Sequence, residues 1–305
     1  MKYEQIEELL QFTDKEIIFM PNEIFNDLKV AIPNSSSHLA FAYSYTYLTT
    51  WIYRYAKHLS TNGFVDNIKM KEILGYNQKY KKLDYLIKKH GLLDQLGYTQ
   101  TVKDFPTTWT YDEFEGLEFG MYSTNKEYLA VLNLSRKFTV KYPVKAFNRY
   151  EQGETDGTFY QFENTHSVPF EVFVFCVDND QLGTIGFYLY SYIKRMNDIF
   201  IKGWDVSLDK LAKETSLPET TLDNYIGALR KYRMIEVKHN QEHFSLGMRL
   251  EDRKANTYKV NGFHQFSKTP QPYEKIKVLN RDEYKKVSEA LWGKKADIEL
   301  EQLPY

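Results

Sequence analysis

Two rows of polar residues recur at helical spacing along this 305-residue chain. Steps of four, three and four place the members of each row on one face of a helix. The row in the C-terminal half consists of Thr220, Asn224, Gly227 and Lys231. The row in the N-terminal half consists of Gln78, Lys82, Tyr85 and Lys89. Hydroxyl, amide and ammonium groups donate hydrogen bonds to base edges and phosphates, so these faces suit a nucleic acid.

Apolar residues occupy the opposite face of each predicted helix. They are Leu222, Tyr225, Ala228 and Leu229 in the C-terminal half, and Tyr80, Leu83 and Ile87 in the N-terminal half. A helix held by one apolar face leaves its other face free to enter a groove. The alternative is that the polar faces only keep the protein soluble.

Basic residues concentrate around these rows. Between residues 77 and 90, five lysines stand against Asp84 alone, so 5 − 1 gives +4; they are Lys79, Lys81, Lys82, Lys88 and Lys89. A second basic group, Arg249, Arg253 and Lys254, lies between two predicted strands and is expected to contact phosphates. Thr220 and Thr221 stand near a predicted helix start, where hydroxyls and free N–H groups also suit a phosphate.

The elements around each row follow one order: a short helix, a tight turn, a longer helix and a strand. In the N-terminal half these are a helix from Asn67, a turn at Gly75, a helix Gln78–His90 and a strand Gly91–Asp94. In the C-terminal half they are a helix Leu208–Lys213, a turn Thr215–Pro218, a helix Glu219–Tyr232 and a strand Ile235–Val237. Each set is the pattern of a helix-turn-helix.

The preceding elements also match, which indicates a weak internal duplication. A strand Ile17–Pro21 corresponds to a predicted strand Phe173–Val177. A helix containing Thr46–Tyr55 corresponds to one containing Phe187–Ile193. Identity between the copies is low, and the apolar pattern carries the alignment.

The run Leu208–Leu222, followed by Arg233–Val237, resembles the winged-helix module of bacterial regulators and of phage or plasmid replication proteins. Arg253–Val260 is similar to the returning strand of its wing. Two such modules in one chain resemble the tandem architecture of replication initiators from plasmids and mobile elements of Gram-positive bacteria. The N-terminal copy departs from the pattern, because its turn is shorter and a long segment follows it.

This resemblance implies an α+β fold with two winged-helix domains in tandem. It implies sequence-specific binding of double-stranded DNA and replication initiation at origin repeats, with a transcriptional repressor or activator as the alternative. Implied partners are double-stranded DNA, host replication proteins and a second copy in a homodimer. A role of the winged helices as protein-interaction modules stays open.

The predicted domains are residues 1–150, with an extended β-rich wing, residues 151–268, and a tail 269–305 with a short helix Asp282–Trp292. The β-rich segment contains predicted strands Trp109–Tyr111, Tyr128–Leu132 and Phe138–Tyr142. It is expected to form either the wing or a small dimerisation sheet. Glu151–Gly157 is the expected flexible junction.

The amino-acid composition excludes several other classes of protein. The chain has 40 Lys and Arg against 41 Asp and Glu, a net charge of −1, which excludes a polycationic wrapping protein. A single cysteine, Cys176, excludes a disulfide framework, and no apolar run is long enough for a membrane span. We therefore expect a cytoplasmic protein with no membrane contact. Aromatic residues, with 25 Tyr and 20 Phe, predict bulky cores.

Catalytic motifs are sparse, so we expect a protein that is not an enzyme and needs no cofactor or metal. The sequence has no phosphate-binding Gly-x-x-x-x-Gly-Lys loop and no His-apolar-His pair for a rolling-circle nickase. Asp178 and Asp180 follow an apolar run and give a less favoured alternative, a Mg²⁺-dependent nucleotidyl enzyme.

Overall fold

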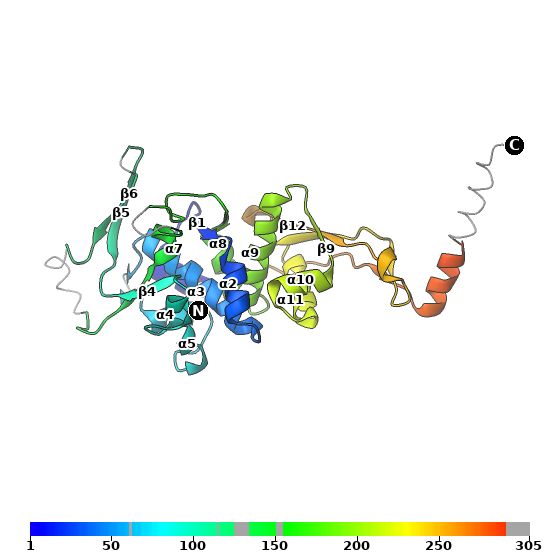
Figure 1. Cartoon of the computed structure of the whole chain (residues 1–305), viewed down its shortest axis with the longest axis horizontal. Coiled ribbons are helices and arrows are strands. Elements are labelled where there is room, and N and C mark those ends of the chain that lie inside the picture. The colour runs from blue at the N-terminus through cyan, green and yellow to red at the C-terminus, as the bar shows by residue number, and fades with distance from the viewer. Residues whose placement is uncertain (61–62, 115, 125–133, 151–154, 291–305) are drawn as a thin grey trace.

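The computed structural model describes residues 1–60, 63–114, 116–124, 134–150 and 155–290. Helices and strands are mixed, which is compatible with the expected α+β class. The molecule is elongated, with a β-hairpin projecting at one end and the C-terminal segment leaving the other (Figure 1).

The centre of the molecule combines one set of elements from each half of the chain. The N-terminal set is α1 Tyr3–Leu10, β1 Ile17–Pro21, α2 Ile24–Ala31 and α3 Ser36–Arg54. The C-terminal set is β8 Thr165–Pro169, α8 Phe170–Asp178 and α9 Gly183–Ile199. β1 pairs antiparallel with β8, with Phe19 opposite Ser167, and α3 packs against α9. Residues on both sides of position 150 thus share a sheet and a core, while the domain division stays a prediction.

Helix α3 is the most deeply buried element. Every residue from Leu39 to Tyr53 is buried, including the polar residues Ser44, Thr46, Thr49 and Thr50. The Ser35 side chain caps its start by accepting a hydrogen bond from the His38 N–H. The indole of Trp51 stacks on the ring of Phe170 with centroids 3.6 Å apart. Aromatic side chains therefore join the two halves, in line with the bulky core expected from composition.

Residues 173–177 are helical, so the predicted strand Phe173–Val177 is wrong. They belong to α8, which is buried along most of its length against α1, β8 and α9. A short apolar run that is buried on all sides has no period that separates strand from helix. The strand of the C-terminal set is β8, directly before this helix.

After α9, the chain forms a helical pair and a three-stranded sheet. The elements are β9 Trp204–Val206, α10 Leu208–Thr215, α11 Glu219–Lys231, β10 Ile235–Lys238 and β12 Asn256–Val260. The sheet is antiparallel in the order β10-β12-β9. The predicted helices Leu208–Lys213 and Glu219–Tyr232 and the predicted strand Ile235–Val237 are confirmed. Between and after these strands lie β11 His243–Phe244, η3 Leu250–Asp252, η4 Phe263–Gln265, β13 Lys277–Val278 and a helix at 281–290.

The corresponding N-terminal elements are shorter and more interrupted. They are β2 Leu59–Ser60, β3 Gly63–Phe64, α4 Asn67–Ile73, η1 Lys81–Leu83, α5 Asp84–Ile87, α6 Leu92–Gln95, β4 Thr99–Val102, β7 Val140–Pro143 and α7 Val144–Phe147. The predicted strand Gly91–Asp94 is wrong, because α6 begins there and the strand follows as β4.

A hairpin is inserted between β4 and β7, which pair with each other. It consists of β5 Pro106–Asp112 and β6 Gly116–Met121, and it contains the predicted strand Trp109–Tyr111. Of the predicted strand Phe138–Tyr142, only the end lies in β7. The predicted strand Tyr128–Leu132 lies outside the described residues, as do residues 151–154 of the predicted junction and the last two residues of the predicted tail helix.

Two histidines are buried in the interior, with exposed fractions of 4% for His58 and 1% for His166. Burial lowers the pKa of His58 to about 3. Burial also lowers the pKa of His166 well below 6.5, and the charges of Arg195 and Lys194 lower it further. The His166 Nδ1–H donates to the Asn22 side-chain oxygen at 3.0 Å, so the Nε2 of the neutral ring accepts from the Tyr43 hydroxyl at 2.7 Å.

We expect this burial to make the fold acid-sensitive. Because an unfolded histidine titrates near pH 6.5, the unfolded chain binds more protons than the folded chain below that pH. The free energy of unfolding should therefore fall by up to about 1.4 kcal/mol per pH unit for each histidine as the pH drops below 6.5. Urea unfolding across this range should show a shallower dependence for His58→Phe than for the unchanged chain. Equal slopes would contradict the assignment.

Within the described residues, no helix combines the length and apolar character needed to cross a membrane.

Candidate nucleic-acid interface

The buried face of α11 matches the sequence prediction. Leu222, Ala228 and Leu229 are buried, and Tyr225 is half-buried. Ile226 is also buried, which the spacing argument had missed. The helix is held against α9, α10 and β10 by this face.

The solvent face of α11 carries most of the predicted polar row. Thr220, Asn224 and Lys231 are exposed, and Thr221 is half-buried near the helix start. Glu219 and Asp223 are exposed on the same helix, so the row lies beside two carboxylates. The solvent face of α11 is therefore polar but not basic over its first turns.

Gly227 does not face open solvent, so its predicted place in the row is wrong. A Cβ at this position would lie 3.0 Å from the hydroxyl of Tyr273, a residue of the C-terminal segment. Glycine in the middle of a helix costs about 1 kcal/mol relative to alanine. The close approach of Tyr273 explains why a glycine occupies this position: the reason is packing and not contact with bases.

The helix predicted over Gln78–His90 is mostly absent. Helical structure covers only η1 and α5, residues 81–87. The Asn77 side chain accepts a hydrogen bond from the Lys79 N–H at 2.8 Å, and the Asn77 carbonyl accepts one from the Tyr80 N–H at 2.9 Å. These local bonds form a turn that competes with helix formation. Asparagine side chains commonly form such turns.

Most side chains of this segment are nevertheless buried or exposed as the sequence predicted. Leu83 and Ile87 are buried, whereas Tyr80, predicted to be buried, is 37% exposed because it lies in the turn before the helix. The predicted contact residues are all exposed: Gln78, Lys79, Lys81, Lys82, Tyr85, Lys88 and Lys89. We call residues 78–89 the lysine segment.

Two buried lysines fix the lysine segment at its two ends. At the first end, Lys71 of α4 donates to the Tyr80 carbonyl at 3.2 Å and to the Asp84 carboxylate. Asp84, the one acid of the segment, is thereby paired with a lysine outside it.

At the second end, Lys141 of β7 donates to the Lys88 carbonyl at 3.2 Å and to Asp94 at 2.6 Å. Its side chain is 1% exposed. Burial lowers the pKa of Lys141, and the hydrogen bond and charge of Asp94 raise it. The sequence did not indicate either lysine as important. A lysine within the apolar strand Val140–Pro143 is nevertheless unusual, and it indicates a buried partner of opposite charge.

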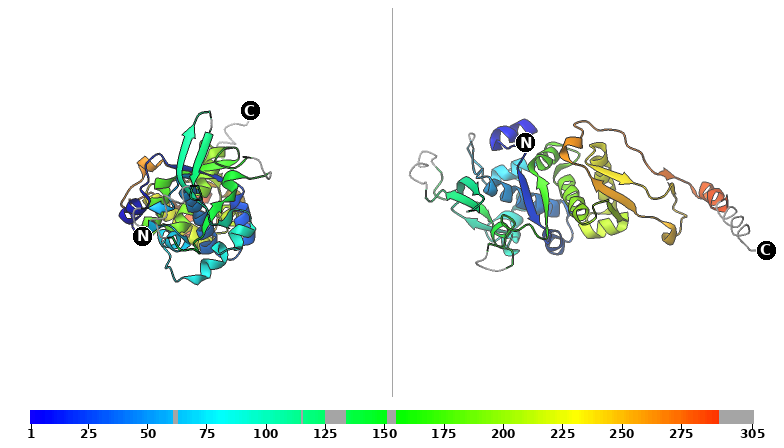
Figure 2. Two further views of the ribbon diagram at one scale, coloured as in Figure 1. Left: turned by 90° about the vertical axis from the view of Figure 1, so that its left-hand side faces the viewer. Right: turned by 90° about the horizontal axis from the view of Figure 1, so that it is seen from above.

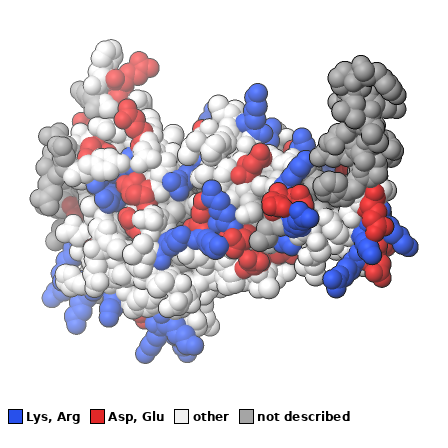
Figure 3. All heavy atoms as spheres, turned by 45° about the vertical axis from the view of Figure 1, so that its right-hand side comes forward, with Lys and Arg blue, Asp and Glu red and all other residues white. Residues whose placement is uncertain are grey.

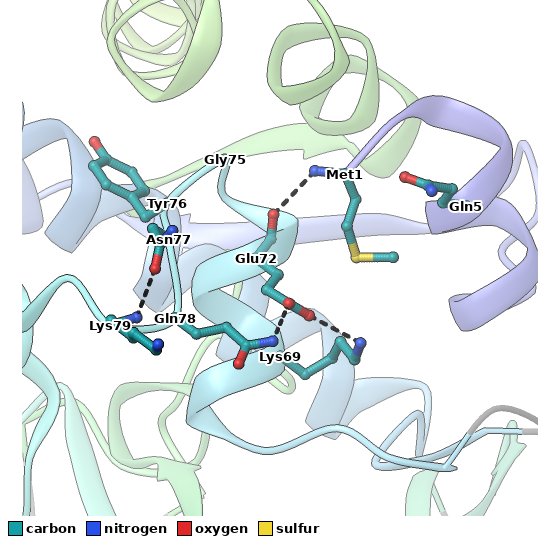
Figure 4. Close-up of a pocket in the computed structure, with 9 residues that line it drawn as sticks. All are labelled: Met1, Gln5, Lys69, Glu72, Gly75, Tyr76, Asn77, Gln78 and Lys79. Atoms are coloured by element: carbon teal, nitrogen blue, oxygen red, sulfur yellow. Dashed lines mark hydrogen bonds and ion pairs between the residues drawn. The ribbon is translucent and has the colours of Figure 1, made fainter.

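Gln78 and Lys79 line a groove of about 820 Å³ between α4 and the chain start (Figure 4). Glu72 is its central group, with Lys69 at 2.9 Å and the Gln78 amide as hydrogen-bonding partners. The Met1 amino group donates to the Glu72 carbonyl at 3.0 Å. Gln78 is thus exposed but already engaged, so Lys79 is the freer of the two.

The predicted wing residues differ in their surroundings. Arg253 donates to the Met248 carbonyl and lies over the Phe244 ring at 5.4 Å, so it braces its own loop. Arg249 pairs with Glu251 at 3.3 Å, with both side chains exposed. Lys254 is exposed. Lys254 is therefore the least engaged of the three.

Asp178 and Asp180 contact the first residues of the chain. Asp178 accepts a hydrogen bond from the Tyr3 N–H at 3.0 Å, and Asp180 pairs with Lys2 at 3.2 Å. Among the described residues, no group of three or more potential ligands from His, Cys, Asp and Glu could hold a metal ion.

The lysine segment and the α10–α11 pair lie along the same edge of the molecule, on either side of the α3 and α9 pair (Figure 1). In Figure 3, Lys and Arg side chains gather at the lower left of the molecule, whereas the rest of the lower edge is mostly uncharged. The β5–β6 hairpin projects toward the opposite edge (Figures 1 and 2). From 104 to 124 the sequence has Asp and Glu but no Lys or Arg, so this hairpin is poorly suited to contact phosphates.

No family model, no curated protein and no solved structure matches this chain.

Proposed function

We propose that this chain binds double-stranded DNA sequence-specifically through two winged-helix units in tandem. The order α9, β9, α10, α11, β10, β12, with its three strands in one antiparallel sheet, supports this for the C-terminal half. In such a unit the second helix of the helical pair enters the major groove. α11 is that helix here, and α5 takes the same place in the N-terminal half.

The observation that carries the proposal is the common edge that holds α11 and the lysine segment. All five lysines of the segment are exposed, and its single acid is paired with Lys71. A duplex along this edge meets a polar helix at one place and the lysine segment at the other. The polar helix is suited to read bases, and the lysine segment to neutralise phosphates.

The role we propose is initiation of replication at origin repeats of a plasmid or mobile element, with host replication proteins and a second copy as partners. The two helices differ in sequence, so one chain fits an asymmetric repeat better than a palindromic operator. A transcriptional regulator would use the same interface beside a promoter. Electrophoretic shifts with DNA flanking the coding region separate the two by the position of the shifted fragment, and no specific shift with any fragment would refute the proposal.

Replacing Asn224 by alanine should reduce discrimination between sites. An asparagine amide that pairs with an adenine edge contributes about 1–3 kcal/mol of discrimination. The ratio of specific to nonspecific affinity should therefore fall roughly 5- to 150-fold, while binding to random duplex stays unchanged. Competition titrations with specific and random duplexes measure this ratio.

Asn26→Ala is the matched control, because Asn26 is an exposed asparagine on α2. It should leave the ratio unaltered. An equal loss in both variants, or none in Asn224→Ala, would remove Asn224 from the reading face.

A further inference from the structure

The segment Ser267–Lys277, here called the strap, follows the C-terminal half of α11. The Ser267 N–H donates to the Tyr232 carbonyl at 2.9 Å, and the Gln271 N–H donates to the Lys231 carbonyl at 2.8 Å. The strap ends at Lys277, where β13 begins and pairs with β11, and Leu279 just after it is buried. The strap is therefore fixed at both ends and borders the candidate reading helix.

One aromatic side chain holds the middle of the strap against α11. Tyr273 lies against Gly227, and the Arg230 guanidinium stands 4.2 Å from the centre of its ring. Arg230 also donates to the Glu274 carbonyl. The strap thus has a defined position beside α11.

A groove of about 370 Å³ separates the strap from β10. Its charged lining comprises Arg230, Lys238, Lys275 and Lys277 against Glu242 and Glu274. Lys238, Lys275 and Lys277 are exposed, so their ammonium groups are accessible. Four cations against two carboxylates make the groove suitable for an anion.

The backbone geometry favours an extended, repeating anion. β10 is an outer strand of its sheet, so alternate N–H groups of β10 point away from β12. Lys275 and Lys277 are two residues apart, which in an extended chain places them on one side about 6.6 Å from each other. A phosphodiester backbone accepts from both kinds of donor.

The charge of the strap also argues against the alternative in which the strap occupies the DNA-binding face of α11 in place of DNA. Such a segment would be acidic, whereas the strap has Lys268, Lys275 and Lys277 against Glu274 alone. A basic segment next to a reading helix adds attraction for the duplex rather than competing with it.

We propose that the groove between β10 and the strap binds the phosphodiester backbone of the duplex that α11 reads. This inference rests on the proposed DNA-binding function. It assigns the C-terminal segment a contact with DNA in addition to the two helices and the wing.

The test is the salt dependence of binding to a random-sequence duplex, measured by fluorescence anisotropy. For the triple variant Lys238→Gln, Lys275→Gln and Lys277→Gln, the slope of log K against log salt should become shallower by about 2.7, because each lost phosphate contact removes about 0.9. Replacing the same three lysines by arginine should keep the wild-type slope. The matched control replaces Lys15, Lys103 and Lys137, three exposed lysines in other turns of the chain, by glutamine and should also keep it.

Failure of DNA binding and failure of the groove assignment give different results. If the unchanged chain binds no duplex, the proposed function fails. If it binds and the triple glutamine variant keeps the full slope, only the groove assignment fails. A slope that is also lost with arginine, or equally in the control, would likewise overturn the assignment. Inorganic phosphate, added as a competitor at constant ionic strength, should not displace the duplex, and displacement at low concentration would show a site for free phosphate instead.

Discussion

A chain in which Lys81, Lys82, Lys88 and Lys89 are all replaced by glutamine should bind duplex DNA roughly 10²- to 10³-fold more weakly at about 0.1 M salt. All four side chains are exposed on the lysine segment. Four lost phosphate contacts make the salt slope shallower by about 3.6, so the difference from the unchanged chain should shrink as salt rises. Anisotropy titrations at several salt concentrations measure both effects.

The control for this variant replaces Lys15, Lys29, Lys103 and Lys137, which are at least partly exposed, with glutamine. It changes the net charge by the same amount, so it separates local contact from the field of the whole protein. Equal losses in the two variants would mean that the lysine segment has no special place in binding.

Replacing Lys141 by methionine should lower the free energy of unfolding by about 3 kcal/mol or more. The change leaves the Asp94 carboxylate, which is 10% exposed, without its cationic partner. Breaking a buried pair from one side typically costs about 3–5 kcal/mol. Asp94 keeps hydrogen bonds from Thr99 and Thr101, which favours the lower end of that range. Urea unfolding of the two chains measures the difference.

The double variant Lys141→Met with Asp94→Asn should recover much of this stability, because neither charge then remains buried and the side-chain amide oxygen can still accept from Thr99 or Thr101. It should still bind DNA more weakly than the unchanged chain, because Lys141 no longer holds the Lys88 carbonyl and the lysine segment loses its fixed end. A double variant as unstable as the single one would show that the unpaired charge of Asp94 is not what destabilises the single variant.

The C-terminal helical pair was predictable because its signals are local. Ser207 caps α10, Pro218 precedes α11, and the apolar row of α11 has clean helical spacing. The strands β10 and β12 follow from runs of β-branched and aromatic residues between polar turns. Each of these elements needs only its own sequence to be placed.

The N-terminal copy was less predictable because tertiary contacts decide its form. The turn at Asn77 interrupts a segment whose spacing reads as one long helix, and Lys71 and Lys141 hold the remainder from other elements. No spacing within residues 77–90 indicates these partners. α8 was misread for a related reason, since burial on all sides removes the periodicity that separates a strand from a helix.

The position of the strap at the candidate site could not be predicted either, because it also depends on a tertiary contact. Gly227 fits the polar row by spacing, and only the position of Tyr273, 46 residues later in the chain, shows that it is covered. A glycine inside a strongly helical segment was the one local sign of a close approach by another part of the chain.

The central claim is that one chain engages a duplex through both α11 and the lysine segment. Footprinting on the DNA that flanks the coding region tests it most directly. We expect two protected stretches on one face of the duplex, separated by about one helical turn or a multiple of it. The Lys81, Lys82, Lys88 and Lys89 variant should lose one stretch and keep the other. A single protected stretch that this variant leaves unchanged, or no protection at all, would contradict the account.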